Sequence, residues 1–209
     1  MTLLPASAMA KASALLGRLR RDRQGVAAVE FAIIVTLMVP LLLGTFETTQ
    51  ALQASRKVSV AARALADLAS QSASLSNTDM TNILNATRAI VAPFPQSRTI
   101  AVVTGIKIDD KGNATVAWSD VCNKAGSMTD SGGNTVGQAR GVGSTVSVPD
   151  GVKPPIGTPG FLVLAEVYHR YVPAIGWKLE AGITLSDRLY SSPRIGASVT
   201  RTGTNPGCS

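Results

Sequence analysis

The residues whose types and spacing could support chemistry lie close to the amino terminus, in residues 18–46. A basic cluster precedes Gly25, and an almost wholly apolar run follows it, interrupted by one charge, Glu30. A carboxylate in an apolar span costs on the order of 2.5 kcal/mol at the centre of a membrane, so Glu30 requires a role. The explanation that we favour is that Gly25 is a cleavage site, where a small residue lets a protease approach the backbone, and that Glu30 acts at the head of the remaining helix. The basic cluster consists of Arg18, Arg20, Arg21 and Arg23.

The apolar run that ends at Phe46 is long enough to cross a membrane, because about 20 helical residues span a hydrocarbon core of roughly 30 Å. The basic cluster before it predicts an amino terminus that stays in the cytoplasm and a carboxyl-terminal part on the other side. Two other interpretations stay open. One is a conventional secretory signal, although the run is longer than the usual apolar region of roughly 7–15 residues. The other is an anchor that is never cleaved.

The sequence from Gly25 to Phe31, GVAAVEF, resembles the processing site of type IV pilin-like proteins when read with the basic residues before it and the apolar run after it. A longer stretch, approximately residues 21–69, resembles the TadE/TadG-like proteins of the tight-adherence (Tad, or Flp) pilus. This resemblance implies a pilin-like fold and an inner-membrane location. It assigns Gly25, Val26, Glu30 and Phe31 to cleavage by a prepilin peptidase. It also implies that Glu30 pairs with the new amino terminus, at Val26, of a neighbouring pilin or pseudopilin subunit.

Composition separates this chain from nucleic-acid-binding proteins. The net charge is +7, but +4 of it lies in residues 1–25, and the aromatic content of 4% gives little material for stacking on bases. We therefore interpret the basic residues as membrane-flanking, and we expect no nucleic-acid partner.

The polar residues of the remaining chain form no recognisable catalytic set. The two cysteines, Cys122 and Cys208, are expected to form one disulfide in an oxidising periplasm. His169, the only histidine, lies among aromatic residues and has no ligand-spaced partners, so we interpret it as structural. Asp109 and Asp110 belong to a sequence typical of a turn, so we interpret them as solvent-exposed turn residues. We expect no metal, no cofactor and no enzymatic activity.

Hydrophobic periodicity predicts an α+β fold. Residues 26–70 have the pattern of one long helix, apolar on all sides at first and amphipathic after Glu47, with a bend at Pro40. A second helix is predicted from the Ser76 cap to about Val91. Alternating residues then predict a small antiparallel sheet of about four strands. The expected strands cover residues 99–108, 114–118, 161–171 and 183–190, with a further short strand at 143–148 inside a long surface excursion of little fixed structure, 123–160.

These features predict a cytoplasmic leader (1–25), a transmembrane helix (26–46), its amphipathic continuation (47–72) and a periplasmic α+β domain (73–209). The leading functional hypothesis is a minor pilin-like pseudopilin that acts in assembly of a Tad-type adhesion pilus. An uncleaved assembly factor in the inner membrane is the second. A membrane-tethered periplasmic enzyme or binding module is the third, and the absence of a catalytic set in the sequence weighs against it.

Overall fold

A computed structural model describes residue 17, residues 24–174 and residues 182–208. The chain divides into two compact units, Met1–Phe46 and Glu47–Ser209. The basic cluster Arg18, Arg20, Arg21 and Arg23 lies outside the described residues, as does most of the leader expected at 1–25.

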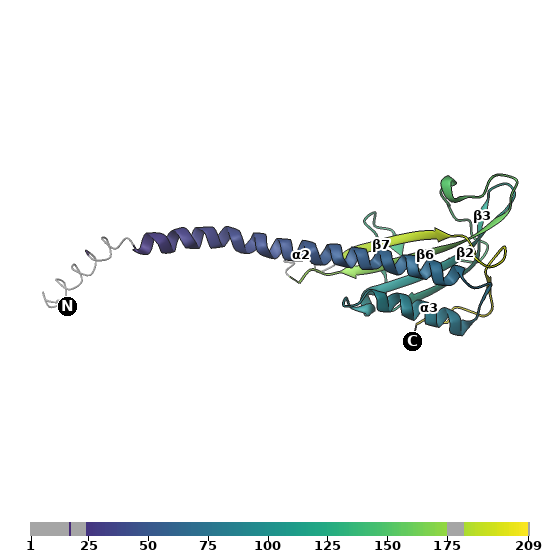
Figure 1. Cartoon of the computed structure of the whole chain (residues 1–209), viewed down its shortest axis with the longest axis horizontal. Coiled ribbons are helices and arrows are strands. Elements are labelled where there is room, and N and C mark those ends of the chain that lie inside the picture. The colour runs from purple at the N-terminus through teal and green to yellow at the C-terminus, as the bar shows by residue number, and fades with distance from the viewer. Residues whose placement is uncertain (1–16, 18–23, 175–181, 209) are drawn as a thin grey trace, which may run out of the picture. The chain divides into compact units, whose positions relative to one another are not determined.

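Helix α2, Gln24–Ser70, confirms the long amino-terminal helix (Figure 1). Its part in the first unit is apolar and continues through Pro40. Two hydroxyls in this part bond to the backbone one turn earlier: Thr36 Oγ1 donates to the Ala32 carbonyl at 2.7 Å, and Thr45 Oγ1 donates to the Leu41 carbonyl at 2.8 Å. Hydroxyls satisfied inside their own helix are tolerated in an apolar environment.

In the second unit, α2 becomes amphipathic and contributes one stripe of side chains to the core. The helix α3, Asn77–Ile90, packs on the same core and begins with the predicted capping box, in which the Ser76 hydroxyl and the Asp79 carboxylate each bond the other residue's backbone N–H. Its inward side chains include Met80 and Leu84. The buried stripe of α2 consists of Ala54, Val58, Ala61, Ala62, Leu65, Ala66 and Ala69.

A four-stranded antiparallel sheet lies against these helices (Figure 1). It is built from β2 (Thr99–Ile108), β3 (Ala114–Asn123), β6 (Gly160–Tyr171) and β7 (Ile183–Ser191), in the order β3-β2-β6-β7. The α+β class and the strand number expected from the sequence are confirmed. Strand β3 continues to Asn123, five residues beyond the strand expected at 114–118, and a register shift between Gly105 and Ile106 interrupts its pairing with β2. Gly105 leaves room for the indole of Trp118, because a Cβ at this position would lie 2.4 Å from it.

The excursion between β3 and β6 has more structure than its composition suggested. It contains the hairpin of β4 (Met128–Thr129) and β5 (Thr135–Val136) and the 3-10 turn η2 (Asp150–Val152). The short strand expected at 143–148 is only an isolated bridge between Thr115 and Thr145. Met128 and Val148 from this excursion are buried against the sheet face opposite the helices. Because both faces are covered, nearly all of β2 is buried.

Three short elements complete the second unit. The two-residue strand β1 (Ser74–Leu75) pairs in parallel with β8 (Thr200–Arg201), so the carboxyl-terminal segment joins the start of α3. The 3-10 turn η1 (Gln96–Arg98) leads from α3 into β2.

Candidate functional site

The residues predicted for processing lie on the first turns of α2. Gly25, Val26, Glu30 and Phe31 are all helical and exposed. Val26 and Glu30 are four residues apart, so their side chains lie on one face of the helix, one turn from each other. This places a carboxylate one turn beyond the bond that cleavage would break.

Gly25 has no packing or conformational reason to be glycine within the described residues. A Cβ built at this position meets no atom within 4 Å, and its backbone is helical rather than left-handed. Glycine inside a helix is less favourable than alanine by about 1 kcal/mol. The fold of this chain therefore does not explain the residue, whereas the approach of another molecule to the backbone would.

The apolar part of α2 presents its side chains outward on every side. In the described part of the chain, one helix, within Gly25–Ser70, is long and apolar enough to cross a membrane, and its most apolar window has a mean hydropathy of 2.5 with none of it buried. An exposed apolar surface of this extent marks contact with lipid or with other proteins. Its large exposed side chains are Val26, Val29, Phe31, Ile33, Ile34, Leu37, Met38, Val39, Leu41, Leu42 and Phe46.

The polar residues in the sheet have structural roles. His169 is 1% exposed, and its Nδ1 lies 2.9 Å from Thr99 Oγ1. Burial, with a smaller contribution from Arg98, lowers its pKa to about 4, so it is neutral at ordinary pH. Asp109 accepts bonds from Lys111 N and Asn113 N within its turn, as expected for turn chemistry. Among the described residues, no group of three or more histidine, cysteine or acidic side chains could hold a metal ion.

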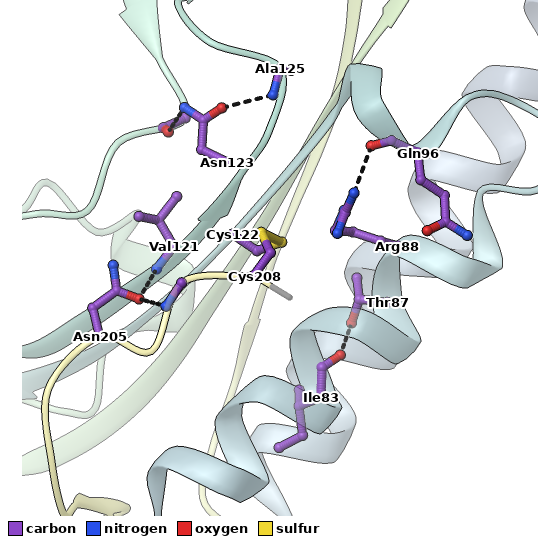
Figure 2. Close-up of a disulfide and its surroundings, with 12 residues drawn as sticks. Ile83, Thr87, Arg88, Gln96, Val121, Cys122, Asn123, Ala125, Asn205 and Cys208 are labelled. Carbon is purple, nitrogen blue, oxygen red and sulfur yellow. Dashed lines mark hydrogen bonds between the residues drawn. A yellow bond between two sulfur atoms is a disulfide. The ribbon is translucent and has the colours of Figure 1, made fainter.

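A disulfide joins Cys122 on β3 to Cys208, as the sequence predicted, with the two Cα atoms 5.0 Å apart. Figure 2 shows the tail lying along β3, where Asn205 Oδ1 accepts bonds from Val121 N and Gly207 N, both at 3.2 Å. The disulfide and these hydrogen bonds therefore both hold the carboxyl-terminal tail against β3.

The same tail carries a buried ion pair that the sequence did not identify. Arg201 Nε donates to Asp120 Oδ2 at 2.7 Å, and the two side chains are only 4% and 3% exposed. The four remaining N–H groups of Arg201 also have acceptors: the carbonyls of Leu75, Thr202 and Thr204 and the Asn77 side chain. One guanidinium thus connects β1, β3, β8 and the start of α3.

A second ion pair, in which the carboxylate is buried and the guanidinium is partly exposed, holds the excursion on the opposite face of the sheet. Arg140 forms a bidentate ion pair with Glu166, which is 4% exposed. The Arg140 Nη2 donates to Glu166 Oε1 at 3.0 Å, and Nη1 donates to Oε2. The Tyr168 hydroxyl donates to the same carboxylate oxygen at 3.0 Å, and burial raises the pKa of this phenol. Sequence reasoning missed both ion pairs because no local pattern joins residues so far apart in the chain.

Tyr171 joins the end of β6 to the first residue of the second unit. Its hydroxyl donates to Glu47 Oε2 at 2.9 Å. Burial first, and then the bond to Glu47, raise the pKa of Tyr171 to about 12, so the phenol stays protonated and keeps donating. This contact fixes where α2 enters the second unit.

Comparison with known protein families shows a match in the amino-terminal part of the chain. Residues 25–67, which are 43 of the 209 residues, match the family described as TadE-like protein. The search of curated proteins and the search of solved structures each gave no match. The matched residues begin at Gly25, include Glu30 and the apolar run, and end within the amphipathic part of α2. The chain therefore carries a TadE-like segment, and that segment forms most of its longest helix.

Proposed function

We propose that this protein is a structural component of a Tad-type pilus assembly apparatus, a minor pilin-like subunit that is cleaved after Gly25 by a prepilin peptidase. Residues 26–46 insert into the inner membrane, with the basic cluster Arg18, Arg20, Arg21 and Arg23 on the cytoplasmic side and residues 47–209 in the periplasm. The observation that carries this proposal is the head of α2: a glycine that the fold does not need and a carboxylate four residues beyond Val26, at the start of a fully exposed apolar helix. The TadE-like segment covers these same residues.

Cleavage gives Glu30 a partner. Hydrolysis after Gly25 frees the amine of Val26, which is positively charged near neutral pH. A carboxylate in an apolar environment is tolerated when it meets an opposite charge and is costly when it does not. When several such helices pack together, the amine of one subunit and Glu30 of another neutralise each other, so processing makes association favourable.

The test of processing compares two glycines in the same helix. A Cβ at Gly25 or at Gly44 meets no atom within 4 Å, so leucine fits at both positions. The intact mass of the membrane-extracted protein should lack residues 1–25 in the wild type and in Gly44→Leu. Gly25→Leu should retain them. A functional wild-type protein that keeps residues 1–25 would reject the pilin-like proposal and favour the uncleaved assembly factor.

The test of Glu30 uses association as its readout. Glu30→Leu makes the span more apolar, so insertion should be kept and cleavage should continue. Crosslinking or co-purification with the other assembly components should fall, because an unpaired amine buried in a helix bundle costs several kcal/mol. Thr36→Val is the matched control, since the hydroxyl that it removes bonds only to its own helix at Ala32. Equal association of Glu30→Leu and Thr36→Val would contradict the proposed pairing.

The orientation is tested separately. A reporter that is active only in the periplasm should work when fused after Ser209 and fail when fused within residues 1–25. The opposite pattern would overturn the orientation taken from the basic cluster.

A further inference from the structure

Three cations from separate parts of the chain lie at one end of the sheet. Arg98 immediately precedes β2, Lys124 immediately follows β3, and Arg170 is the next-to-last residue of β6. The register brings them to one level, since Thr99 pairs with His169 and Ile100 pairs with Asn123. Neighbouring strands lie about 4.8 Å apart, so the three backbones span on the order of 10 Å. We call Arg98, Lys124 and Arg170 the cationic end.

The cationic end is the end of the second unit at which α2 enters it. Tyr171 follows Arg170 in β6, and its hydroxyl bonds to Glu47, the first residue of that unit. Glu47 in turn follows Phe46 directly in the sequence. If residues 26–46 are inserted in a membrane, this covalent connection brings the cationic end to the membrane surface.

Charge is unevenly distributed between the two ends of the second unit. Near the cationic end, the described acidic groups are Glu47, which accepts the Tyr171 hydroxyl, and Asp130, whose carboxylate accepts bonds within its own loop from Gly132 and Asn134. Arg56 and Lys57 add two exposed cations on α2. At the opposite end of the sheet, the described cations have carboxylates beside them. Lys107 and Lys111 flank Asp109 and Asp110 in the sequence, and Lys153 bonds to Asp150. Arg201, which lies near Asp79, is paired with Asp120.

We propose that the cationic end binds the anionic phospholipid headgroups of the membrane that holds α2. This inference rests on the membrane insertion proposed above and adds a second contact to it. Lys or Arg side chains near an anionic leaflet contribute about 1 kcal/mol each. The tether through Phe46 keeps the surface near the bilayer, so a weak contact of this kind suffices to hold the domain in one orientation.

The helical cations reinforce this contact from a greater distance. Arg56 and Lys57 lie nine and ten residues beyond Glu47, about 14–15 Å along a helix. The headgroup layer is roughly 5–7 Å thick on each side of the hydrocarbon core, and the Debye length at physiological salt is about 8 Å. Arg56 and Lys57 therefore act through the diffuse field of the surface, whereas the exposed side chains of Arg98 and Lys124 reach the headgroups. Arg170 donates from Nη2 to the Ser127 carbonyl and adds its charge from within the sheet.

The test places the full-length protein in lipid nanodiscs of neutral phosphatidylcholine or of phosphatidylcholine mixed with phosphatidylglycerol, and measures amide hydrogen exchange. Residues 92–99 and 123–127 should exchange more slowly in anionic discs, and 0.5 M NaCl should abolish the difference. Arg98→Gln with Lys124→Gln should lower the ratio of bound to unbound domain roughly 30-fold, at about 1 kcal/mol for each cation. Lys107→Gln with Lys111→Gln, an equal charge change on exposed residues at the opposite end, should leave the difference intact.

Exchange at residues 26–46 reports membrane insertion independently. One outcome is that residues 26–46 are protected in both kinds of disc while residues 92–99 and 123–127 exchange at the same rate in neutral and anionic discs. That result would refute headgroup binding and support insertion. Headgroup binding by the cationic end is also refuted if the two double variants lose the slowing of exchange in anionic discs to the same extent. The effect would then depend on net charge and not on the position of the cations. If residues 26–46 exchange freely in both kinds of disc, insertion itself fails, and headgroup binding fails with it.

Discussion

Replacing Arg201 with methionine should strongly destabilise the second unit. The substitution removes the only basic partner that the structure gives Asp120, whose side chain is 3% exposed, and leaves four other acceptors without their donor. Breaking a buried ion pair from one side costs about 3–5 kcal/mol. For a domain of this size, 1 kcal/mol corresponds to roughly 2–4 °C in Tm, so the expected fall in Tm is roughly 6–20 °C.

The chain contains a matched exposed pair for comparison. Arg194 contacts Asp67, but these side chains are 61% and 41% exposed. Exposed ion pairs contribute about 0–1 kcal/mol, so Arg194→Met should lower Tm by no more than a few degrees.

The assay is thermal unfolding of the oxidised full-length protein in detergent, followed by tryptophan fluorescence. Trp118 is a local reporter, since its indole donates to the Val199 carbonyl at 2.8 Å. Asp120→Leu should also cost less in the Arg201→Met background than in the wild type, because the carboxylate that it removes no longer has a partner. Equal effects of Arg201→Met and Arg194→Met would refute the assignment of Arg201 as the residue that holds the tail.

Three further outcomes are expected. Gly105→Val should cost about 1–3 kcal/mol, because its side chain would overlap the neighbouring indole, whereas Gly151→Ala, with open space around it, should change unfolding in urea by less than about 0.5 kcal/mol. Because the folded pKa of His169 is lowered to about 4 from 6.5, its neutral form stabilises the fold fully above pH 6.5, and on the order of 3 kcal/mol should be lost as the pH falls to about 4. Urea titrations at several pH values should show this loss in the wild type and a smaller one in His169→Gln; equal losses would exclude His169 as the cause. Reducing the bridge between Cys122 and Cys208, which are 86 residues apart, should lower the free energy of unfolding by about 4.5 kcal/mol, and an unchanged urea midpoint would contradict this value.

Local patterns in the sequence were sufficient for the two helices and for the positions of the four strands of the main sheet. The apolar run, the Ser76 cap and the alternation in residues 161–171 each specify their structure through neighbours within a few residues. Gly25 and Glu30 were singled out by residue type and spacing, and their role in processing stays a prediction. The structure adds that a Cβ at Gly25 would meet no atom within 4 Å. With two cysteines in the chain, only one intramolecular disulfide was possible.

The excursion between β3 and β6 shows where this reasoning fails. Its glycine-, serine- and proline-rich composition indicates a loop, but composition does not reveal which surface a loop covers. The face of β2 and β6 that points away from the helices is apolar, and burying it requires Met128, Val148 and the contact of Arg140 with Glu166. One signal in the sequence pointed to a covering layer on this face. At the start of residues 161–171, the side chains expected on both faces of the strand are apolar, as is typical of a strand covered on both sides.

The sequence by itself determined the long apolar helix, the second helix, the positions of the main strands and the disulfide, because each depends on residues close in the chain or, for the cysteines, on a single possible pairing. Only the tertiary structure decided the strand order and the ion pair between Asp120 and Arg201, which are 81 positions apart. It also decided that Arg98, Lys124 and Arg170 meet at the end of the sheet where Tyr171 contacts Glu47. The physical reason is that charges and hydroxyls select partners by distance and burial in the folded chain. Those quantities are set by the packing of the whole domain and not by the spacing of residues along it.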